Sequence, residues 1–493
     1  MPDASFYPEL GTRLEALVRT AYGVLMLATL LQALPEARRF FLSERWGGYA
    51  KSTRDVDAVQ NPVVMPLFVA AWFLAAAALA TGWWSPWPAI LNLAFCRYFF
   101  IHMRWKGILR GMGAPGFIAY WVGLVVCLFE VTARFAPEVR PLALLVAQVD
   151  LACIMLTAGI YKFAAGYPQN HGMELGLCNP MWGYWWRWYI KRRPASPVFW
   201  TMNQLAWGTE VVAALLMLVP ATREVGGLLI LVSFAFIATQ IRLGFLCEMV
   251  MAGSLIFIPP DGWIAGWFPW IGWIGGAAPA VAGEAGSAGA VLRVALWTYL
   301  ALLPLAYGGL YYNFYARRRL PALVQRVLER YTNFFGLILW RVFSVDLVNF
   351  FIRLSRRTGE RLTAIAPLGD LHASGYRGAW SRFNHVGEMI CLTSLFTTLK
   401  YYPSNDVLFQ ERLRRYARTL PHEAGETLVF EYVSVVKRDT RFDWVPVGEY
   451  QVDPANGAIT TRWIDPEFSP HAGHRDSPLH EGDVPGSYVP ASR

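Results

Sequence analysis

The chain has 493 residues, of which 55% are hydrophobic and only 16% are charged. Soluble globular domains average about 25% charged residues, so this composition excludes an ordinary soluble protein and predicts a polytopic membrane protein. The formal net charge is +9. Because the basic residues stand between apolar segments, we interpret them as topology signals and as contacts to membrane lipids with anionic headgroups, not as a nucleic-acid surface.

The apolar segments that are candidates for transmembrane helices are residues 14–34, 63–82, 89–103, 117–135, 142–162, 198–220, 225–242, 245–259 and 291–312. About 20 apolar residues cross the hydrocarbon core of a bilayer, so the segments at 89–103 and 245–259 are short and either tilted or re-entrant. We therefore expect an all-α polytopic membrane bundle of about eight or nine transmembrane helices over residues 1–319. A small C-terminal α+β soluble domain is expected to follow it.

Positive charge alternates between the predicted spans. The loops at residues 36–54, 104–110 and 187–193 and the run 317–319 are basic, whereas residues 82–88 and 261–289 contain no lysine or arginine. By the positive-inside rule, the basic loops and the C-terminal domain face the cytoplasm and the N-terminus lies outside. We expect a multi-pass integral protein of the bacterial cytoplasmic (inner) membrane.

The character of the sequence changes after Arg319. Residues 320–363 are predicted to form an amphipathic, interfacial helical linker, with a second helix over 335–354 that carries Arg341, Asp346 and Arg353. Residues 364–464 are predicted to form the α+β domain, a candidate for binding a protein partner. Its expected elements are a helix at 407–419 and strands at 427–436, 445–452 and 458–463. Residues 465–493 have the composition of a disordered tail, in which histidines are expected to be solvated.

Ionisable residues inside predicted spans are the first candidates for a functional site. Lys162 ends the apolar run at 142–160, and Asp150 lies near its middle. An ionisable group at the centre of a membrane costs roughly 2.5–3.5 kcal/mol, so its presence indicates function by default. Desolvation favours the neutral amine of a buried lysine, which can then accept a proton. In the structural alternative, Lys162 reaches the membrane interface and Asp150 pairs with an arginine.

Glu210 precedes an apolar helical stretch and has two interpretations. It either orients or pairs with Lys162 as a second catalytic residue, or it is a helix N-terminal carboxylate stabilised by the helix dipole. Arg242 and Glu248 bracket a glycine turn within apolar sequence and are candidates for cofactor contact or for pairing with each other. His102 either lies at the interface or lines the site.

Residues 182–193 combine tryptophans and tyrosines with basic side chains, and Trp186 lies near their centre. Between two spans, this pattern favours an interfacial helix on anionic headgroups, or the lid of a lipid or quinone cleft, over a surface that binds nucleic acid. The six cysteines are scattered and form no cluster with histidine, so no metal site is predicted.

Several short motifs occur in a fixed order: Arg110-Gly111-Met112-Gly113, Ala158-Gly159-Ile160-Tyr161-Lys162, Trp207-Gly208-Thr209-Glu210, Arg242-Leu243-Gly244-Phe245 and Pro259-Pro260. Their order and spacing over roughly residues 12–315 resemble the horizontally transferred transmembrane (HTTM) domain. This domain is the membrane part of vitamin K-dependent gamma-glutamyl carboxylases and their bacterial relatives.

The resemblance implies a catalytic base at Lys162 and a lipid-soluble quinone or quinol as cosubstrate. It also implies that the loop after Lys162 faces the non-cytoplasmic side, opposite to the prediction from charge. Where carboxylase-type members carry a Phe-His pair, this chain has Phe234-Ala235.

Three functional classes remain open on the sequence. The first is a membrane-embedded enzyme that uses Lys162 as its base. The second is a non-catalytic membrane scaffold or complex subunit whose C-terminal domain binds a partner protein. The third, a small-molecule transporter, is the least favoured, because no pair of interrupted spans in matching halves indicates an inverted repeat. The sequence does not decide whether the protein is an enzyme.

Overall fold

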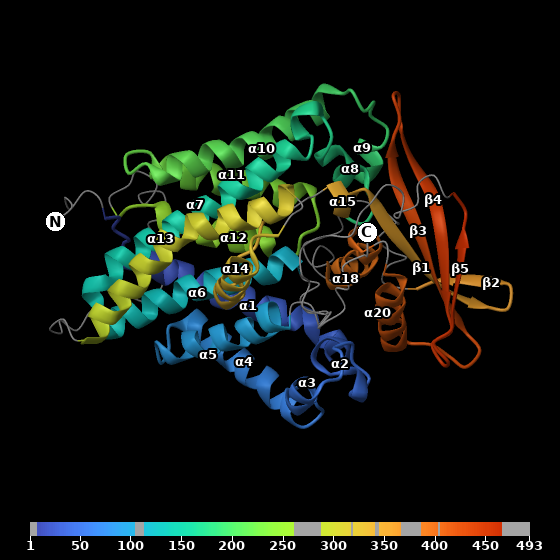
Figure 1. The fold of residues 1–493 in the computed structure, drawn as a ribbon, viewed down its shortest axis with the longest axis horizontal. Coiled ribbons are helices and arrows are strands. Elements are labelled where there is room, and N and C mark those ends of the chain that lie inside the picture. Colours follow the sequence, from blue (N-terminus) through green and yellow to red (C-terminus); the bar gives the residue numbers. More distant parts are fainter. Residues whose placement is uncertain are drawn as a thin grey trace.

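The computed structural model describes residues 7–103, 113–260, 287–316, 319–340, 345–365, 386–402 and 405–465. These residues form a helical bundle with a five-stranded antiparallel sheet at one end (Figure 1). The long helices of the bundle are α1 (Thr12–Ala33), α4 (Val64–Thr81), α6 (Gly113–Phe135), α7 (Arg140–Ala164), α10 (Pro197–Leu218), α11 (Arg223–Gln240) and α13 (Ser287–Tyr315).

Within the described residues, 6 helical segments are long and apolar enough to cross a membrane, fewer than the eight or nine expected. They are Thr12–Phe41, Val64–Thr81, Gly116–Phe135, Pro137–Ala164, Arg223–Gln240 and Gly289–Tyr315. The expected span at 89–103 divides into α5 (Trp87–Cys96) and a π-helical turn, and the one at 245–259 contains α12 (Leu246–Ser254) and a 3-10 turn. Helix α10 is as long as α1 but is not among these 6 segments, although the sequence predicted a span at 198–220.

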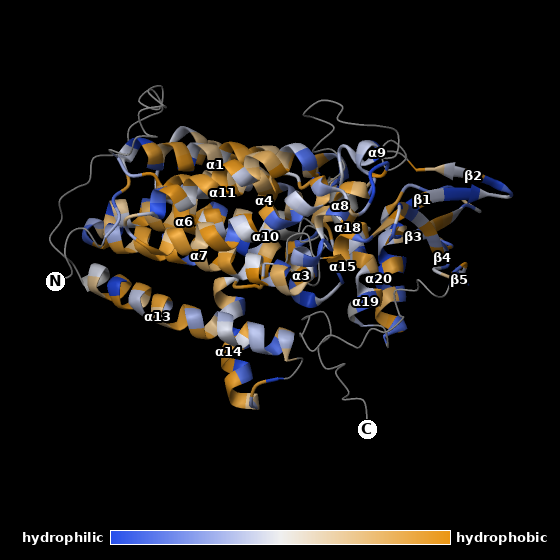
Figure 2. Ribbon diagram, turned by 90° about the horizontal axis from the view of Figure 1, so that it is seen from above, coloured by the Kyte–Doolittle hydropathy of each residue, from blue (hydrophilic) through white to orange (hydrophobic). Residues whose placement is uncertain are grey.

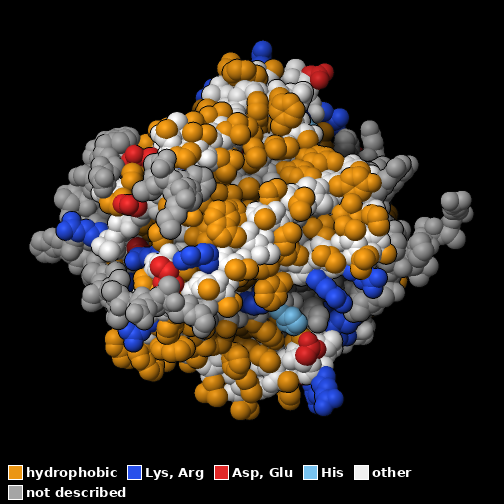
Figure 3. Space-filling model, turned by 60° about the vertical axis from the view of Figure 1, so that its left-hand side comes forward, with side chains coloured by type: hydrophobic (Ala, Val, Ile, Leu, Met, Phe, Trp, Pro, Cys, Tyr) orange, Lys and Arg blue, Asp and Glu red, His pale blue; other side chains and the backbone are white. Residues whose placement is uncertain are grey.

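The exposure of the long helices distinguishes the centre of the bundle from its periphery. The most apolar windows of α6 and α7 are each 78% buried, whereas those of α4, α11 and α13 are only 28–33% buried. The helices are predominantly hydrophobic along their length, while the sheet is more polar (Figure 2). In one view of the surface, hydrophobic side chains cover a broad area and the charged side chains lie mostly towards its margins (Figure 3). The outer helices therefore present apolar side chains as lipid-facing helices do.

Ion pairs connect α1 with the central helices near the end of the bundle that is remote from the sheet. Arg19 of α1 lies 3.3 Å from Glu130 of α6, and Arg140 of α7 contacts Glu15 of α1. Asp150 of α7 is different. Pairing with an arginine was the expected alternative to a functional role for Asp150. This pairing is wrong, because the Asp150 carboxylate accepts hydrogen bonds from Trp121 and Tyr299 instead.

Several shorter helices accompany the long ones. They are α2 (Ala37–Phe41), α3 (Arg54–Val59), α8 (Met173–Cys178), α9 (Trp186–Tyr189), α14 (Ala322–Phe335) and α15 (Val345–Val348). Helix α14 confirms the first half of the expected linker as a helix. Its apolar residues Leu323, Val324 and Val327 are exposed, as in an amphipathic helix without a protein partner on that face.

The C-terminal sheet has the order β2-β1-β3-β4-β5. Its strands are β1 (Phe350–Thr358), β2 (Arg361–Ala364), β3 (Thr427–Lys437), β4 (Phe442–Val452) and β5 (Ile459–Trp463). Helices α18 (Val386–Phe396), α19 (Thr398–Tyr401) and α20 (Asp406–Thr419) accompany it. Phe396 and Phe409 of these helices pack against Tyr450 of β4, at ring distances of 5.6 and 5.1 Å. The three strands and the helix that the sequence predicted in this domain are confirmed.

The expected helix over residues 335–354 is wrong in most of its described part, because α14 ends at Phe335, α15 covers only Val345–Val348, and β1 begins at Phe350. Phe350 faces Ser434 and Leu354 faces Phe430 in the antiparallel register with β3. The charges at Asp346 and Arg353 indicated an amphipathic helix, but backbone pairing with β3, a strand far away in the sequence, decides the conformation. The sheet thus includes residues before 364. The predicted tail, the motif at residues 110–112 and most of the loop at 261–289 lie outside the described residues.

Candidate functional site at the sheet-facing end of the bundle

Helices α7 and α10 approach closely at Gly159. A Cβ atom at this position would lie 2.6 Å from Cγ2 of Val211 and 3.0 Å from the carbonyl oxygen of Trp207, both on α10. Only a glycine allows the backbones to approach this closely, as small residues do where membrane helices pack together. Lys162 lies one turn beyond Gly159 on α7, and this contact brings it within reach of Glu210.

The structure confirms that Lys162 and Glu210 lie together. The Lys162 amine donates a hydrogen bond to Oε1 of Glu210, and the two side chains are only 2% and 3% exposed. Oε2 of Glu210 has no hydrogen-bond partner among the described residues. The interpretation of Glu210 as a helix N-terminal carboxylate is wrong, because α10 begins at Pro197 and Glu210 lies well inside it.

A buried lysine–glutamate contact is suited to proton transfer. The pair is electrically neutral overall both as ammonium with carboxylate and as amine with carboxylic acid. Moving the proton from Lys162 to Glu210 therefore creates a neutral amine without leaving a net charge in the interior, where an unpaired charge is costly. The free amine can then accept a proton from a bound substrate.

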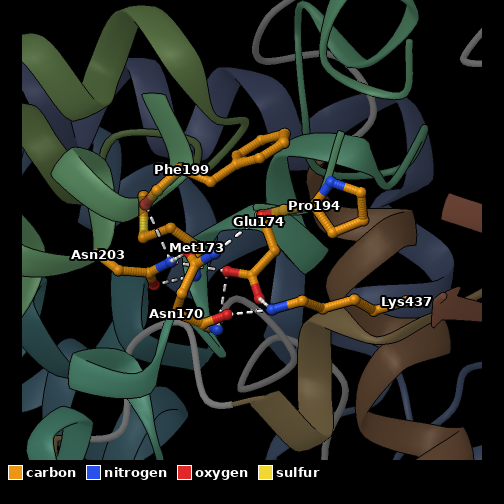
Figure 4. Close-up of polar contacts among 8 residues, drawn as sticks. Asn170, Met173, Glu174, Pro194, Phe199, Asn203 and Lys437 are labelled. Atoms are coloured by element: carbon orange, nitrogen blue, oxygen red, sulfur yellow. Dashed lines mark hydrogen bonds and ion pairs between the residues drawn. The ribbon is translucent and has the colours of Figure 1, made fainter. Parts of the chain in front are cut away.

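A second polar cluster lies between the bundle and the sheet and centres on Glu174 of α8, which is fully buried. Its Oε2 accepts hydrogen bonds from the Gly172 amide at 2.9 Å and from Nδ2 of Asn203 at 2.8 Å. Its Oε1 lies 3.2 Å from the amine of Lys437, which extends from β3 (Figure 4). Nδ2 of Asn203 also donates to Oδ1 of Asn170.

Helix α10 connects the two clusters. Asn203 and Glu210 are seven residues apart, which places them on one face of the helix about 10 Å apart along its axis. Tyr167 is fully buried and interacts electrostatically with both Glu210 and Glu174. Burial raises the pKa of the Tyr167 phenol, and the nearby Tyr161, Glu210 and Glu174 raise it further. Tyr167 therefore keeps its proton and is a neutral hydroxyl in the neighbourhood of both carboxyl groups.

Arg242 holds a loop in place. Its Nη1 donates to the carbonyl oxygens of Pro180 at 2.6 Å and Met181 at 3.4 Å, and its backbone amide donates to the Trp182 carbonyl. The guanidinium lies 5.1 Å from the centre of the Tyr184 ring. Burial lowers the pKa of the Arg242 guanidinium. Arg242 thus fixes the start of the aromatic segment that contains Trp186.

Trp186 lies between the bundle and the sheet. Its ring centre is 4.8 Å from that of Trp444 on β4, and the ring of Phe199 on α10 meets that of Phe442 edge-to-face at 5.4 Å. Its neighbours Trp185 and Trp188 are 43% and 45% exposed, as expected for an interfacial segment.

Glu248 and His102 are the remaining candidates. Glu248 is half-buried in the first turn of α12, the helix that follows Arg242. His102 ends the π-helical turn after α5, with its side chain 54% exposed and 3.8 Å from Asp55. The structure therefore brings Lys162 to Glu210, and Arg242 to the segment of Trp186.

The sequence interpretation missed Tyr167, Glu174, Asn203 and Lys437. One usable signal was the helical spacing of Asn203 and Glu210 on an otherwise apolar helix. Comparison of the chain with protein-family models, with characterised proteins and with solved structures finds no match.

Proposed function

We propose that this protein is a multi-pass integral membrane enzyme of the bacterial inner membrane that resembles the vitamin K-dependent carboxylase-like HTTM proteins. Lys162 is its base, and Glu210 holds the proton that the lysine must release before it can act. The observation that carries the proposal is the direct contact of these two side chains, both almost fully buried at one end of the bundle. Lysine is suited to this role because its protonation state responds to burial, whereas arginine stays protonated.

The proposed cosubstrate is a lipid-soluble quinone or quinol. A quinone offers a flat ring and carbonyl oxygens that accept hydrogen bonds. The indole N–H groups of Trp182, Trp186 and Trp444 are buried and have no acceptor among the described residues. These donors fit the acceptor groups of such a ligand, and Arg242 holds the segment that carries two of them. When bound, the quinol would supply reducing equivalents, and the chain would position it and shield it from water.

We propose further that α10 crosses the membrane together with the 6 apolar segments. The α5 and α12 regions would then be short, tilted or re-entrant segments, which restores the arrangement expected from the sequence. Lys162 ends α7 shortly before Asn170, whose carbonyl oxygen accepts a hydrogen bond from Lys437 of β3. Trp186, next to the basic segment at residues 187–193, contacts Trp444 of β4, so all three regions lie at the same end of the molecule. One reporter fusion at the C-terminus therefore fixes the side of the membrane for all three. An active alkaline phosphatase fusion would contradict the cytoplasmic placement and agree with the resemblance.

The test of the proposed function is a Lys162→Arg variant, assayed by complementation of a deletion strain. Arginine keeps the positive charge and can still contact Glu210, so expression and folding should remain close to those of the wild type. The variant should nevertheless lose function, because arginine cannot give up its proton. Glu210→Gln should also fail to complement. Full complementation by Lys162→Arg would reject the catalytic role.

The alternative is a membrane scaffold whose C-terminal domain binds a partner protein. Its support comes from the sheet edges: within the described residues, β2 and β5 each pair on one side only, and nearly all their residues are exposed. Open edge strands are sites at which a partner can add a strand. The Lys162→Arg experiment separates the two proposals, because a scaffold retains its function in that variant.

A further inference from the structure

Asp150 is a buried acid that the proposed reaction does not use. It lies near the middle of α7, 4% exposed, and twelve residues before Lys162, which corresponds to about 18 Å along the helix. Its Oδ2 accepts two hydrogen bonds, from Nε1 of Trp121 on α6 at 3.0 Å and from the Tyr299 hydroxyl on α13 at 2.8 Å. Its Oδ1 is buried and has no hydrogen-bond partner in the described part of the chain.

The other buried acids of the bundle differ from Asp150 in that each has a cationic partner. The pairs are Glu15 with Arg140, Glu130 with Arg19, Glu174 with Lys437 and Glu210 with Lys162. Among the described residues, Asp150 forms no such pair. In the described part of the bundle, each buried carboxylate thus has a cationic partner except the one at the centre, where a charge is most costly.

The groups that face Asp150 from the neighbouring helices are all uncharged near neutral pH. They are Tyr120 and Trp121 of α6, Cys153 of α7, Tyr299 and Tyr307 of α13, and Tyr331 of α14. Two neutral donors on one oxygen compensate only part of the loss of hydration of an ionised carboxylate. The Tyr307 hydroxyl is also buried without a hydrogen-bond partner in the described residues. Among the described residues, no cation contacts Asp150; of the groups around it, Arg97 reaches only the Tyr120 hydroxyl, at 3.4 Å. The site also contains two buried oxygen atoms without a hydrogen-bond partner in that part of the chain.

We propose that Asp150 is a proton-binding site at the centre of the bundle and that it holds its proton in the resting protein. The carboxylate takes one proton from hydronium, which leaves water, and returns it to water by the reverse step. Tyr331 of α14 lies beside Tyr299: their rings are 6.3 Å apart, and the half-buried Tyr331 donates a hydrogen bond from its hydroxyl to the Tyr299 carbonyl oxygen at 3.2 Å. The site is separate from Lys162 and Glu210 and does not depend on the proposed function.

Infrared spectroscopy of the purified protein in lipid nanodiscs tests this proposal, because a carboxylic acid has a C=O band that a carboxylate lacks. We expect an acid band at neutral pH that moves to lower frequency when aspartate is labelled with ¹³C at the side-chain carboxyl. Asp150→Asn should remove the band. Asp55→Asn, which changes an exposed aspartate, should leave it in place.

The variant Tyr299→Phe keeps the test decisive even if Asp150→Asn does not fold. It removes one hydrogen bond to Oδ2, so the acid band should move to higher frequency without disappearing. The absence of an acid band in the labelled wild type from mildly acidic to mildly alkaline buffer would overturn the proposal. A band that disappears when sodium replaces potassium would also overturn it, because it would indicate a site for a metal cation instead.

Discussion

Replacing Gly159 with alanine tests the packing that positions the candidate site. The new Cβ would lie 2.6 Å from Cγ2 of Val211 and 3.0 Å from the Trp207 carbonyl oxygen. The carbonyl oxygen belongs to the backbone of α10, so it cannot move away unless the helix shifts. Lys162 is one turn away from this contact on α7. A shift of α10 therefore also disturbs the contact between Lys162 and Glu210.

Gly208 provides the matched control, because it lies inside α10, and its Cβ would meet no atom within 4 Å. Alanine is favoured over glycine in a helix by about 1 kcal/mol, and both variants receive this gain. Overpacking costs about 1–3 kcal/mol, and only Gly159→Ala incurs it. The free energy of unfolding should therefore be about 1–3 kcal/mol lower for Gly159→Ala than for Gly208→Ala.

The measurement is reversible unfolding of the two variants in mixed micelles, by titration with a denaturing detergent. Complementation of the deletion strain should fall for Gly159→Ala and stay at the wild-type level for Gly208→Ala. Equal unfolding free energies for the two variants would refute the close approach of α7 and α10, and with it the geometry that we assign to Lys162.

Two contacts between the sheet and the bundle, and one ion pair within the sheet region, allow three further predictions. Each is measured by the rate at which trypsin releases the C-terminal domain. Lys437→Met should weaken the docking of the sheet on the bundle by about 3–5 kcal/mol, because it leaves the fully buried Glu174 without its cation. Trypsin should then release the domain faster. Arg438→Met removes an ion pair with Asp443 in which the arginine side chain is half-exposed. It should change the free energy of docking by less than about 1 kcal/mol and leave the release rate close to that of the wild type. Trp444→Ala should cost about 2 kcal/mol or more through lost packing against Trp186, and a rate equal to that of the wild type would contradict this contact.

The membrane helices were predictable because long apolar runs leave few alternatives to a helix. Lys162 and Glu210 were also visible, since each is an ionisable residue in an apolar context. The span predicted at 198–220 already placed Glu210 inside a helix, and the structure agrees, because α10 begins at Pro197. The helix-cap interpretation of Glu210 instead started the helix at the purely apolar stretch that follows this residue. The starting point of α10 decides whether Glu210 caps a helix or faces Lys162.

The cluster around Glu174 was beyond sequence interpretation for a different reason. Lys437 is 263 positions from Glu174, and the two meet only because the sheet packs on the end of the bundle. The strand at Phe350 was missed in the same way, because its pairing with β3 joins distant segments. Contacts at such separation depend on tertiary structure, which local periodicity does not encode.

The central claim, that Lys162 and Glu210 form a buried charge pair, is tested most directly by a double-mutant cycle on unfolding free energy. Lys162→Met and Glu210→Gln should each cost about 3–5 kcal/mol, since each leaves one charge buried without its partner. The double variant should be less destabilised than either single variant, because it leaves no charge behind. Strictly additive free energies in the three variants would show that the two side chains do not interact and would contradict the account.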